Sequence, residues 1–432
     1  MPVIVIVGGG FAGMAVARRL ERRLRPNEAE IVLLSQENYT LFTPMLPEVT
    51  SGELEVRHVV TPIRAQLRRT RFVLARVEEI DASKSAVSYR HVLTGRSFRQ
   101  PYDHLVLALG SSTSDFGLPG VAEHTWALKT LADADALRNR LVWLLELADT
   151  IDDDVRRERL LTVVVVGGGF TGVEAAGEIG ELFRDVIRFY KRLRAGRVKV
   201  ILVEAGPVLL AGLPAKMGEY SRRILERRGI EVLTGDGVVR ADAQGLTLQS
   251  GRRIETETIV WSAGVKPSPT IASVALPKTK RGAIETARDM SVPGWSGVWA
   301  LGDCAVIPDE SGGFYPLTAQ HAIREGPRLA ENIVAALRNR PTKPFRYRTL
   351  GMMAALGGRK GVAQLPGDLV VTGFVAWFFW RTYYLLRLPG LDRKLRVAFD
   401  WTLELIFPRD TAELRFGRRQ DDVSHEEMRA AP

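Results

Sequence analysis

Hydrophobic residues along this chain gather into short apolar runs, several of which end in glycine-rich turns. Val3–Val7 and Val163–Val166 contain only β-branched residues, and such uninterrupted runs are typical of parallel strands buried on both faces. Ile31–Ser35 and Val200–Glu204 have the same apolar character and end in a polar residue. Because the first two runs each lead through a glycine turn into a helical pattern, the sequence predicts an α/β protein.

The same glycine spacing follows both of the first two runs. Glycines occupy relative positions 1, 3 and 6 of each turn: Gly8, Gly10 and Gly13 in the first copy, and Gly167, Gly169 and Gly172 in the second. The first glycine permits a tight turn, the second lets backbone approach a pyrophosphate, and the third lets helix pack against strand. Phosphates would then face unpaired N–H groups at a helix N-terminus. Two copies predict two dinucleotide sites, with two glycine-rich turns of an ordinary α/β protein as the alternative.

The order of the predicted elements indicates one domain interrupted by another. Alternating runs at Phe72–Val77 and Ala86–His91 predict a small antiparallel sheet inserted into the first domain. The segment Phe116–Gly120 reads as a crossover, and the strand Gly297–Asp303 returns the chain to the first domain. We expect the first domain to comprise residues 1–125 and 265–340, the second residues 126–264, and a C-terminal module residues 341–432.

Composition narrows the class of protein. The chain has 432 residues, of which 46% are hydrophobic, enough for two or three folded domains. The single cysteine, Cys304, excludes an intrachain disulfide and a dithiol redox pair, and we expect it to be a small buried residue. The apolar N-terminus lacks the basic segment of a signal peptide. The longest apolar run, Leu369–Trp380, is shorter than the roughly 20 residues of a transmembrane helix.

These segments together resemble the type II NADH:quinone oxidoreductases, single-chain flavoproteins with two dinucleotide-binding domains. Beside the glycine motifs, the resemblance rests on Asn38–Pro44, Tyr102–Gly110, Phe116–Gly120, Lys129 before Asp133, Trp261–Val265, Gly302–Ala305 and Thr318–Gln320. It implies two Rossmann-like domains, the FAD domain being interrupted by the NADH domain, and a C-terminal amphipathic module that associates with a membrane. The implied reaction passes a hydride from NADH to FAD and then two electrons to a membrane quinone, menaquinone or ubiquinone, without pumping protons.

The residues that end two predicted strands distinguish the two nucleotide sites. Glu204 is placed to accept hydrogen bonds from an adenosine ribose and to repel a 2′-phosphate, which favours NADH over NADPH. A solvated strand-end glutamate is the alternative. Glu204 follows Gly172 by more than the usual ~20 residues, so we expect an extended helix through Ile179–Leu193. In the first domain Ser35 has the equivalent place and would bond the ribose more weakly.

Further cofactor contacts follow from the resemblance. Asp303 would bind the ribityl chain of FAD, unless it is only a helix N-cap. The helix that Thr318, Ala319 and Gln320 begin would point its positive N-terminus at the flavin ring. Thr43, Pro44 and Gly110 are expected at the flavin, and Gly264 is expected at a cofactor site. No cysteine lies in the loop around Thr43, which argues against a dithiol route and against a sulfide-oxidising relative.

Three polar residues are expected to serve the two half-reactions. Glu174 would orient the nicotinamide carboxamide, unless it is an ordinary first-turn helix glutamate. Gln320 would contact the quinone, and Arg324 stands where the family has a second glutamine. At a spacing of four residues both side chains face the same way. His321, beside Gln320, is either an ordinary exposed or packed histidine or a proton donor.

The C-terminal module carries the signal for a membrane. Trp377–Arg387 is densely aromatic, and Asp392–Phe407 predicts an amphipathic helix with Leu395, Phe399, Leu403 and Ile406 along one stripe and Arg393, Arg396, Asp400 and Glu404 along another. Aromatic and arginine side chains suit a membrane interface. We therefore expect peripheral attachment to the cytoplasmic face of the cell membrane, through anionic lipid. A helix that covers the domain or forms a homodimer is the alternative.

The net charge of +10 fits this interpretation, because a basic surface attracts anionic lipid. No nucleic-acid-binding motif accompanies the charge. Two other functions remain open at this point. One is a soluble NADH-dependent reductase of a protein acceptor such as ferredoxin, and the other is a flavin- and NADH-binding sensor with low turnover.

Overall fold

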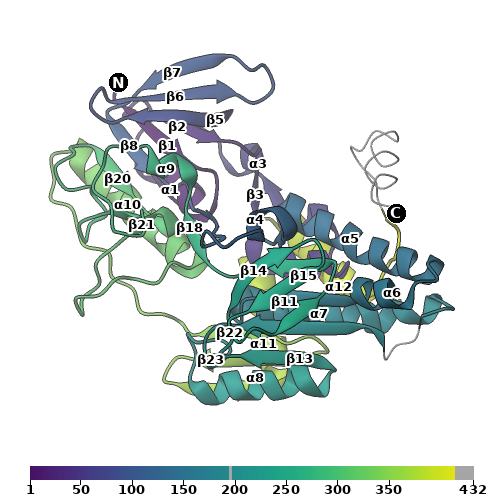
Figure 1. The fold of residues 1–432 in the computed structure, drawn as a ribbon. Coiled ribbons are helices and arrows are strands. Elements are labelled where there is room, and N and C mark those ends of the chain that lie inside the picture. The colour runs from purple at the N-terminus through teal and green to yellow at the C-terminus, as the bar shows by residue number, and fades with distance from the viewer. Residues whose placement is uncertain (194–196, 414–432) are drawn as a thin grey trace.

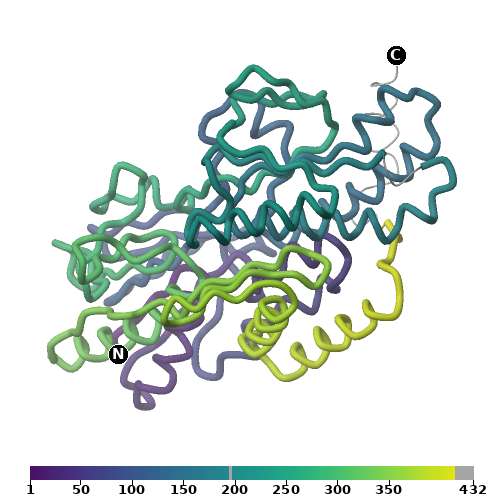
Figure 2. Tube along the Cα trace, turned by 90° about the horizontal axis from the view of Figure 1, so that it is seen from below, coloured from purple at the N-terminus to yellow at the C-terminus, as the bar shows by residue number. Residues whose placement is uncertain are grey.

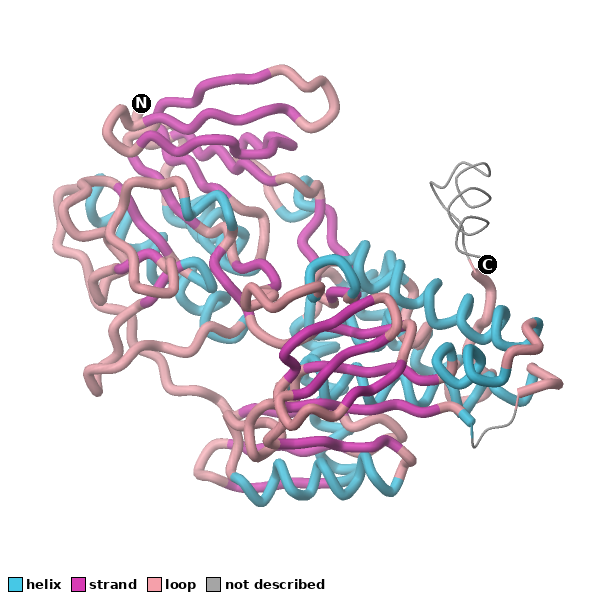
Figure 3. Tube along the Cα trace, in the orientation of Figure 1, coloured by secondary structure: helices cyan, strands magenta, loops and turns pink. Residues whose placement is uncertain are grey.

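The structure is a computed structural model that describes residues 1–193 and 197–413. Residues 414–432 of the expected C-terminal module lie outside this range. Two sheets organise most of the chain, one in the upper left of Figure 1 and one in the lower right. Figure 3 shows that helices flank the strands of both. The chain forms six strands of the first sheet, then the strands of the second sheet, and then adds β20 to the first sheet.

The first sheet has seven strands in the order β20-β8-β1-β2-β5-β6-β7. Their bounds are β1 Val3–Val7, β2 Glu30–Ser35, β5 Arg71–Asp81, β6 Ala86–His91, β7 Ser97–Pro101, β8 His104–Leu107 and β20 Val298–Ala300. β1 runs parallel to both β2 and β8. Ile4 and Ile6 belong to one buried cluster and Val5 and Val7 to another. The central strand is therefore covered on both faces, which explains its unbroken apolar run.

The antiparallel part of this sheet continues the parallel part through β5. β5 pairs in parallel with β2 through Arg71–Leu74 and antiparallel with β6 through Ala75–Asp81. The predicted antiparallel sheet is confirmed as β5-β6-β7, and β5 joins it to the parallel strands. β5 has 11 residues and β2 has six, so β5 extends beyond its neighbour and carries the hairpin as a continuation of the same sheet.

Two long helices of the first domain pack against each other. These are α1 (Phe11–Arg23) and α10 (Ala319–Leu337). A Cβ at Gly326 of α10 would lie only 2.5 Å from Cβ of Ala15 on α1, so a glycine there permits their close approach. Shorter elements complete the domain: β3 Tyr39–Leu41, η1 Thr43–Met45, α2 Leu46–Thr50, η2 Val56–Val59, β4 Val60–Pro62, α3 Ile63–Gln66, α9 Pro269–Ala272, β19 Ile284–Glu285, η5 Gly302–Cys304 and β21 Ala305–Val306. The predicted burial of Cys304 is confirmed.

The second sheet is parallel, in the order β10-β17-β11-β12-β13. Its strands are β10 Trp126–Ala127, β11 Thr162–Val166, β12 Lys199–Glu204, β13 Ile230–Thr234 and β17 Thr258–Trp261. The helices are α4 Val121–His124, α5 Leu131–Thr150, α6 Asp154–Leu160, α7 Phe170–Val186, η3 Ile187–Phe189 and α8 Ala215–Arg227, and an antiparallel sheet adds β14 Val238–Asp242, β15 Gly245–Leu248 and β16 Arg253–Glu255. The helix expected through Ile179–Leu193 ends earlier: α7 stops at Val186, and the 3-10 turn η3 covers Ile187–Phe189.

The two connections between the domains lie side by side. β9 (Ser111–Thr113), on the way out of the first domain, pairs antiparallel with β18 (Val265–Pro267), on the way back. A short sheet therefore joins the two passages of the chain. Beside this sheet, Nε1 of Trp261 donates to the carbonyl of Ser114, although 147 positions separate the two residues in the sequence.

The C-terminal module is a three-stranded antiparallel sheet followed by two helices. Its elements are β22 Met352–Ala355, β23 Gly361–Leu365, β24 Leu369–Thr372, α11 Gly373–Arg387 and α12 Leu391–Leu403. β22 packs on α7 and α12 packs on η2, so the module contacts both domains, as the view from below shows (Figure 2). The run Leu369–Trp380 divides into strand and helix at Gly373, which has a φ of +74°. Among residues 1–193 and 197–413, none of the helices combines the length and the hydrophobicity that a transmembrane span requires.

Candidate functional site

The first glycine turn forms an open cradle at the N-terminus of α1. Gly8 has a φ of +112°, and a Cβ there would overlap the carbonyl oxygen of Ala108. A Cβ at Gly13 would overlap the carbonyl oxygen of Gly8, so helix and strand meet closely. Around Gly10, by contrast, there is open space, and no side chain caps the helix. Free N–H groups beside open space suit a pyrophosphate.

The second turn repeats this geometry at the N-terminus of α7. Gly167 also has a φ of +112°, a Cβ at Gly172 would overlap the carbonyl oxygen of Gly167, and the space around Gly169 is open. No side chain caps α7 either. The chain therefore holds two cradles of the same construction, one at the carboxyl end of a central strand of each sheet.

The strand-end residues lie beside these cradles. Glu204 accepts hydrogen bonds from the N–H groups of Gly168 at 2.5 Å and Gly206 at 2.6 Å, so its carboxylate is fixed next to the second turn. Ser35 is buried beside the first turn, where a Cβ at Gly9 would lie 2.6 Å from its hydroxyl oxygen. In dinucleotide-binding folds, side chains at these two strand ends hydrogen-bond the ribose.

Asp303 joins a small polar group that lies between the two domains. Its Oδ2 accepts a hydrogen bond from the hydroxyl of Ser111 at 2.7 Å, and Lys129 donates to Ser111 at 2.9 Å. Lys129 Nζ is 3.8 Å from Asp303 Oδ2. Asp303 makes no helix cap, so that alternative does not describe it. Sequence reasoning quoted Lys129 without a role and missed Ser111, because the contact spans 192 positions.

The start of α10 approaches the same region. Thr318 caps the helix by accepting from the N–H of His321. Glu325, further along α10, is buried and accepts from the N–H of Gly302 at 2.8 Å, which links the helix to the turn that carries Asp303. Burial raises the pKa of Glu325 to about 7. Sequence reasoning missed this residue, since a charged residue beside Arg324 reads as part of a solvated face.

The loop predicted over the flavin is a short 3-10 turn. Thr43 and Pro44 form η1, and just before it the hydroxyl of Thr40 donates to the carbonyl of Gly9 at 3.3 Å. The loop is thereby tied to the first glycine turn. Gly110 has a φ of +66° with open space around its Cβ position, as expected where a bound group approaches backbone.

Gln320 and Arg324 face the same neighbour, in agreement with their spacing. Gln320 Oε1 accepts from the hydroxyl of Tyr347 and from the N–H of Leu350, and its Nε2 donates to the carbonyl of Gly351. The guanidinium of Arg324 lies 4.4 Å from the centre of the Tyr347 ring. Both residues therefore contact the segment that leads into β22 and the C-terminal module.

His321 is a packed histidine. It is 2% exposed, its Nδ1 lies 2.7 Å from the Thr318 hydroxyl oxygen, and its ring meets Tyr347 edge-on at 5.3 Å. Burial, with a smaller effect from Arg324, lowers its pKa below the usual value. The imidazole is part of an aromatic cluster with Tyr315 and Tyr347. Of the two alternatives for this residue, the structure shows the packed histidine.

Glu174 lies on α7 and faces the C-terminal module. Its Oε1 accepts from the N–H of Ala355 on β22 at 3.1 Å and from Nε1 of Trp380 on α11 at 2.9 Å. Burial raises its pKa to about 8. Glu174 is the fifth residue of α7, so it is not a first-turn glutamate stabilised by the helix dipole. Its predicted contact with nicotinamide stays a prediction.

Buried charges attach the C-terminal segment to both domains. Arg409 donates to Glu53 at 3.1 Å and to Glu178 at 2.9 Å, and Arg381 of α11 donates to Glu53 at 2.7 Å. Glu53 belongs to the first domain and Glu178 to α7. Burial and the nearby Glu178 carboxylate raise the pKa of Glu53 to about 8. Such pairs are costly to break because the remaining charge has no water around it.

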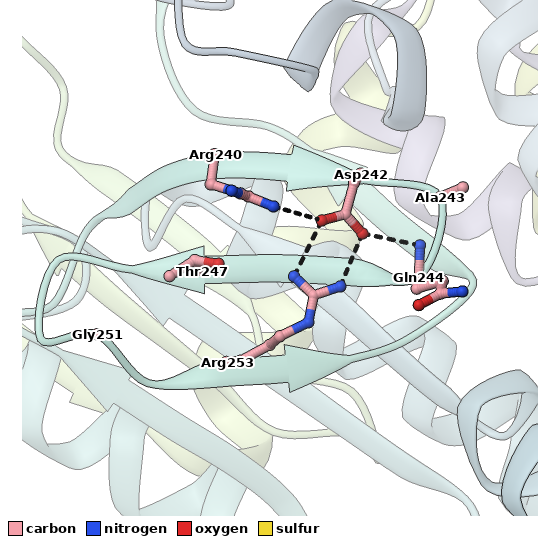
Figure 4. A pocket seen from close by; sticks show the side chains of 7 residues that line it. All are labelled: Arg240, Asp242, Ala243, Gln244, Thr247, Gly251 and Arg253. Carbon is pink, nitrogen blue, oxygen red and sulfur yellow. Dashed lines mark hydrogen bonds and ion pairs between the residues drawn. The ribbon is translucent and has the colours of Figure 1, made fainter.

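A surface hollow elsewhere on the second domain is not part of this site. It has a volume of about 610 Å³ and lies on the sheet β14-β15-β16 (Figure 4). Its acidic group, Asp242, is already bound by Arg253 at 2.7 and 3.0 Å, by Arg240 at 3.2 Å and by the N–H of Gln244. These bonds, chiefly those from Arg253, hold its pKa below the usual value. No residue of either glycine turn lines the hollow.

Comparison with known proteins identifies relatives over nearly the whole chain. The family model of the pyridine nucleotide-disulphide oxidoreductases matches residues 2–326, and that of the NDH2 C-terminal domain matches residues 350–410. The type II NADH:quinone oxidoreductase Ndh of Mycobacterium tuberculosis is 32% identical over 421 residues, which cover 94% of this chain and 88% of that protein. NdhA of the same organism, also a type II NADH:quinone oxidoreductase, is 33% identical over 423 residues, covering 93% and 87%.

A solved structure shares the fold. NDH2 from Plasmodium falciparum in complex with NADH superposes with a TM-score of 0.88 at 19% identity, covering 95% of this chain and 99% of that one. Membership of the pyridine nucleotide-disulphide oxidoreductases implies FAD as the cofactor. The two cradles, the matched C-terminal domain and the relatives agree, and the chain belongs to the type II NADH:quinone oxidoreductases, which oxidise NADH and reduce a quinone without pumping protons.

Proposed function

We propose that this enzyme holds FAD at the first glycine turn and NADH at the second, and reduces menaquinone or ubiquinone while attached to the cytoplasmic face of the cell membrane. The observation that carries the proposal is the pair of open, uncapped helix N-termini at Gly10 and Gly169. The bound flavin supplies the redox chemistry, which is two-electron transfer from NADH to a quinone. The residues around it bind and orient the reactants.

In the flavin site, Asp303 would accept hydrogen bonds from the ribityl hydroxyls. The hydroxyl of Ser111 and the ammonium of Lys129 hold that carboxylate in place. Ser35 would bond the adenosine ribose, and Thr43, Pro44 and Gly110 would approach the flavin through backbone and small side chains. The N-terminus of α10, at Thr318, Ala319 and Gln320, would stabilise negative charge on the flavin ring, because a helix N-terminus carries partial positive charge.

In the nucleotide site, Glu204 would select NADH. Its carboxylate is fixed beside the second glycine turn by two backbone N–H groups, so it cannot swing away from a bound ribose without losing them. A 2′-phosphate would meet this fixed negative charge at short range. Gly264, just after β17, would contact the dinucleotide through its backbone, and Glu174 would orient the carboxamide.

The quinone site would lie where α10 meets the start of the C-terminal module. Gln320 is largely occupied by the segment Tyr347–Gly351, so it would position that segment and retain one N–H for a quinone carbonyl. Arg324 would donate to the same carbonyl in place of the family's second glutamine. Its stacking on Tyr347 keeps the guanidinium on this side of α10.

Exposed apolar side chains on the C-terminal helices support membrane attachment. They are Phe374, Val375, Phe378, Phe379 and Leu386 of α11, Leu391, Leu395, Phe399 and Leu403 of α12, and Leu405, Ile406 and Phe407 beyond it. Leu395, Phe399 and Ile406 are 63%, 62% and 71% exposed, whereas Val397 and Trp401 dock α12 on the domain. A large exposed apolar surface of this kind usually marks a site that binds a partner or a membrane. We assign it to lipid, because basic and aromatic side chains accompany it.

The test combines a quinone assay with vesicle binding. The double variant Leu395→Glu/Phe399→Glu should lose sedimentation with vesicles of anionic lipid and lose turnover of menaquinone or ubiquinone in those vesicles, while reduction of ferricyanide by NADH continues. Leu93→Glu, at an exposed turn of the first domain, is the matched control and should behave as wild type. Unchanged vesicle binding of the double variant contradicts the lipid assignment. If in addition a wild-type dimer becomes a monomer in that variant, the surface joins two subunits instead.

A further inference from the structure

Phe116 has an unusual combination of exposure and backbone conformation. Its side chain is 62% exposed, and its φ is +53°. A bulky residue other than glycine rarely adopts this left-handed region, because the conformation costs free energy. Such residues persist where the surrounding structure holds them, and they gather at ligand sites. Phe116 lies between β9 and α4, where the chain crosses from the first domain to the second.

Hydrogen bonds fix this loop to the end of strand β17. The N–H of Ser114 donates to the carbonyl of Gly264 at 3.2 Å, and Nε1 of Trp261 donates to the carbonyl of Ser114 at 2.8 Å. The N–H of Phe116 in turn donates to the Ser114 hydroxyl at 3.2 Å. The left-handed backbone is thereby held against the second sheet, and Phe116 has a defined place there.

The ring of Phe116 lies on Gly264. A Cβ at Gly264 would overlap the ring carbons, and the ring meets Trp261 at an angle of 63° with centroids 6.4 Å apart. Gly264 closely follows the carboxyl end of β17. The hydroxyl of Ser262 there donates to the carbonyl of Val166 at 2.8 Å, at the second glycine turn. The ring is thus located at the edge of the sheet where dinucleotides bind.

The order of strands says which half of a dinucleotide would come near the ring. β11, which carries the glycine turn, lies between β12 and β17. Glu204 at the end of β12 is on the adenosine side, so a dinucleotide that crosses the turn extends its nicotinamide half toward β17. The flavin site lies in this direction too, because β9 begins at Ser111, which bonds Asp303.

We propose that Phe116 contacts the nicotinamide half of bound NADH and positions the nicotinamide for hydride transfer to the flavin. This inference rests on the proposed placement of NADH at the second glycine turn. The exposed ring provides an apolar face for the nicotinamide ring or its ribose, and the fixed backbone keeps that face in place without a further loss of conformational freedom on binding. Gly264 leaves the room that the ring needs.

The test compares ligands with and without the nicotinamide. Phe116→Ala should raise the inhibition constant of NAD⁺ and the KM for NADH about tenfold, as for loss of an aromatic contact. Inhibition by ADP-ribose, which lacks nicotinamide, should stay within about twofold of wild type, since its contacts are unchanged. Phe116→Leu, which retains apolar volume, should be intermediate. Phe98→Ala, at an exposed aromatic on β7, is the control.

Two outcomes would overturn the inference. One is an unchanged KM for NADH and an unchanged rate of flavin reduction in Phe116→Ala. The other is an equal weakening of NAD⁺ and ADP-ribose, which would mean that the substitution disturbs the whole second domain. Failure of the proposed placement of NADH has a different signature, because Glu204→Arg at the second glycine turn would then leave inhibition by ADP-ribose unchanged.

Discussion

The buried carboxyl of Glu174 should make the stability of this protein depend on pH. Burial raises its pKa from 4.5 to about 8, even though two N–H groups donate to it. The folded protein therefore keeps a proton that the unfolded chain releases above pH 4.5. The free energy of unfolding should fall as the pH rises from 4.5 to about 8, and this contribution should be constant outside that window.

Glu174→Gln isolates this effect. The amide keeps a carbonyl oxygen for the N–H groups of Ala355 and Trp380 but has no proton to lose. Within the window each pH unit costs the wild type about 1.4 kcal/mol. Relative to the variant, the wild type should therefore lose about 4 kcal/mol between about pH 5 and about pH 8.

Urea unfolding with saturating FAD, followed by tryptophan fluorescence at several pH values, measures the difference between the two proteins. Glu219→Gln, on the exposed side of α8, is the control and should differ from wild type by a constant amount. A difference between Glu174→Gln and wild type that stays constant over the window would refute the reasoning. It would mean that the carboxyl has the same charge in the folded and the unfolded chain.

Two further substitutions test the cofactor site and the C-terminal attachment. Glu204→Arg should raise the ratio of kcat/KM for NADPH over that for NADH by about 30-fold, because it removes a like charge facing the 2′-phosphate. Glu204→Gln should raise this ratio less. An unchanged ratio in both variants would exclude the ribose role of Glu204. Arg409→Ala should lower the free energy of unfolding by about 3 kcal/mol or more, because the buried Glu178 carboxylate loses the guanidinium that neutralises it and keeps the hydrogen bond from the Ser51 hydroxyl. Calorimetry checks this against Arg222→Ala on the exposed surface, and equal melting temperatures of the two variants would contradict it.

Local sequence determined the two nucleotide cradles. The positive φ of Gly8 and Gly167, and the close approaches of Gly13 to Gly8 and of Gly172 to Gly167, arise within the turn between one strand and its helix. These constraints act within about six residues, so glycine spacing records them directly. The place of Glu204 was predictable for a related reason, because the carboxyl ends of neighbouring parallel strands meet at one edge of a sheet. The predicted family follows from the same segments and is confirmed.

Periodicity predicted an amphipathic C-terminal helix but left its orientation open. Helical spacing put Leu395 and Phe399 on one stripe, yet an apolar stripe is compatible with burial against the domain as well as with exposure. In the structure Val397 and Trp401 are the buried residues through which α12 packs on the rest of the protein. Asp400 accepts a hydrogen bond from the N–H of Glu55 and pairs with the ring of His58. The docking partners come from η2, about 340 positions earlier, so no local pattern contains them.

Tertiary structure alone decided which buried polar groups meet. Asp303 finds Ser111 and Lys129 across the domain junction, Glu174 turns toward Trp380, and Arg409 reaches carboxylates of both domains. Each residue taken alone reads as an ordinary surface charge or cap, because the sequence does not show how far it is removed from water. Burial sets the cost of charge and therefore the pKa of Glu174 and the strength of the C-terminal attachment. The sequence by itself determined the two open glycine turns, and the packing of three modules decided what surrounds them.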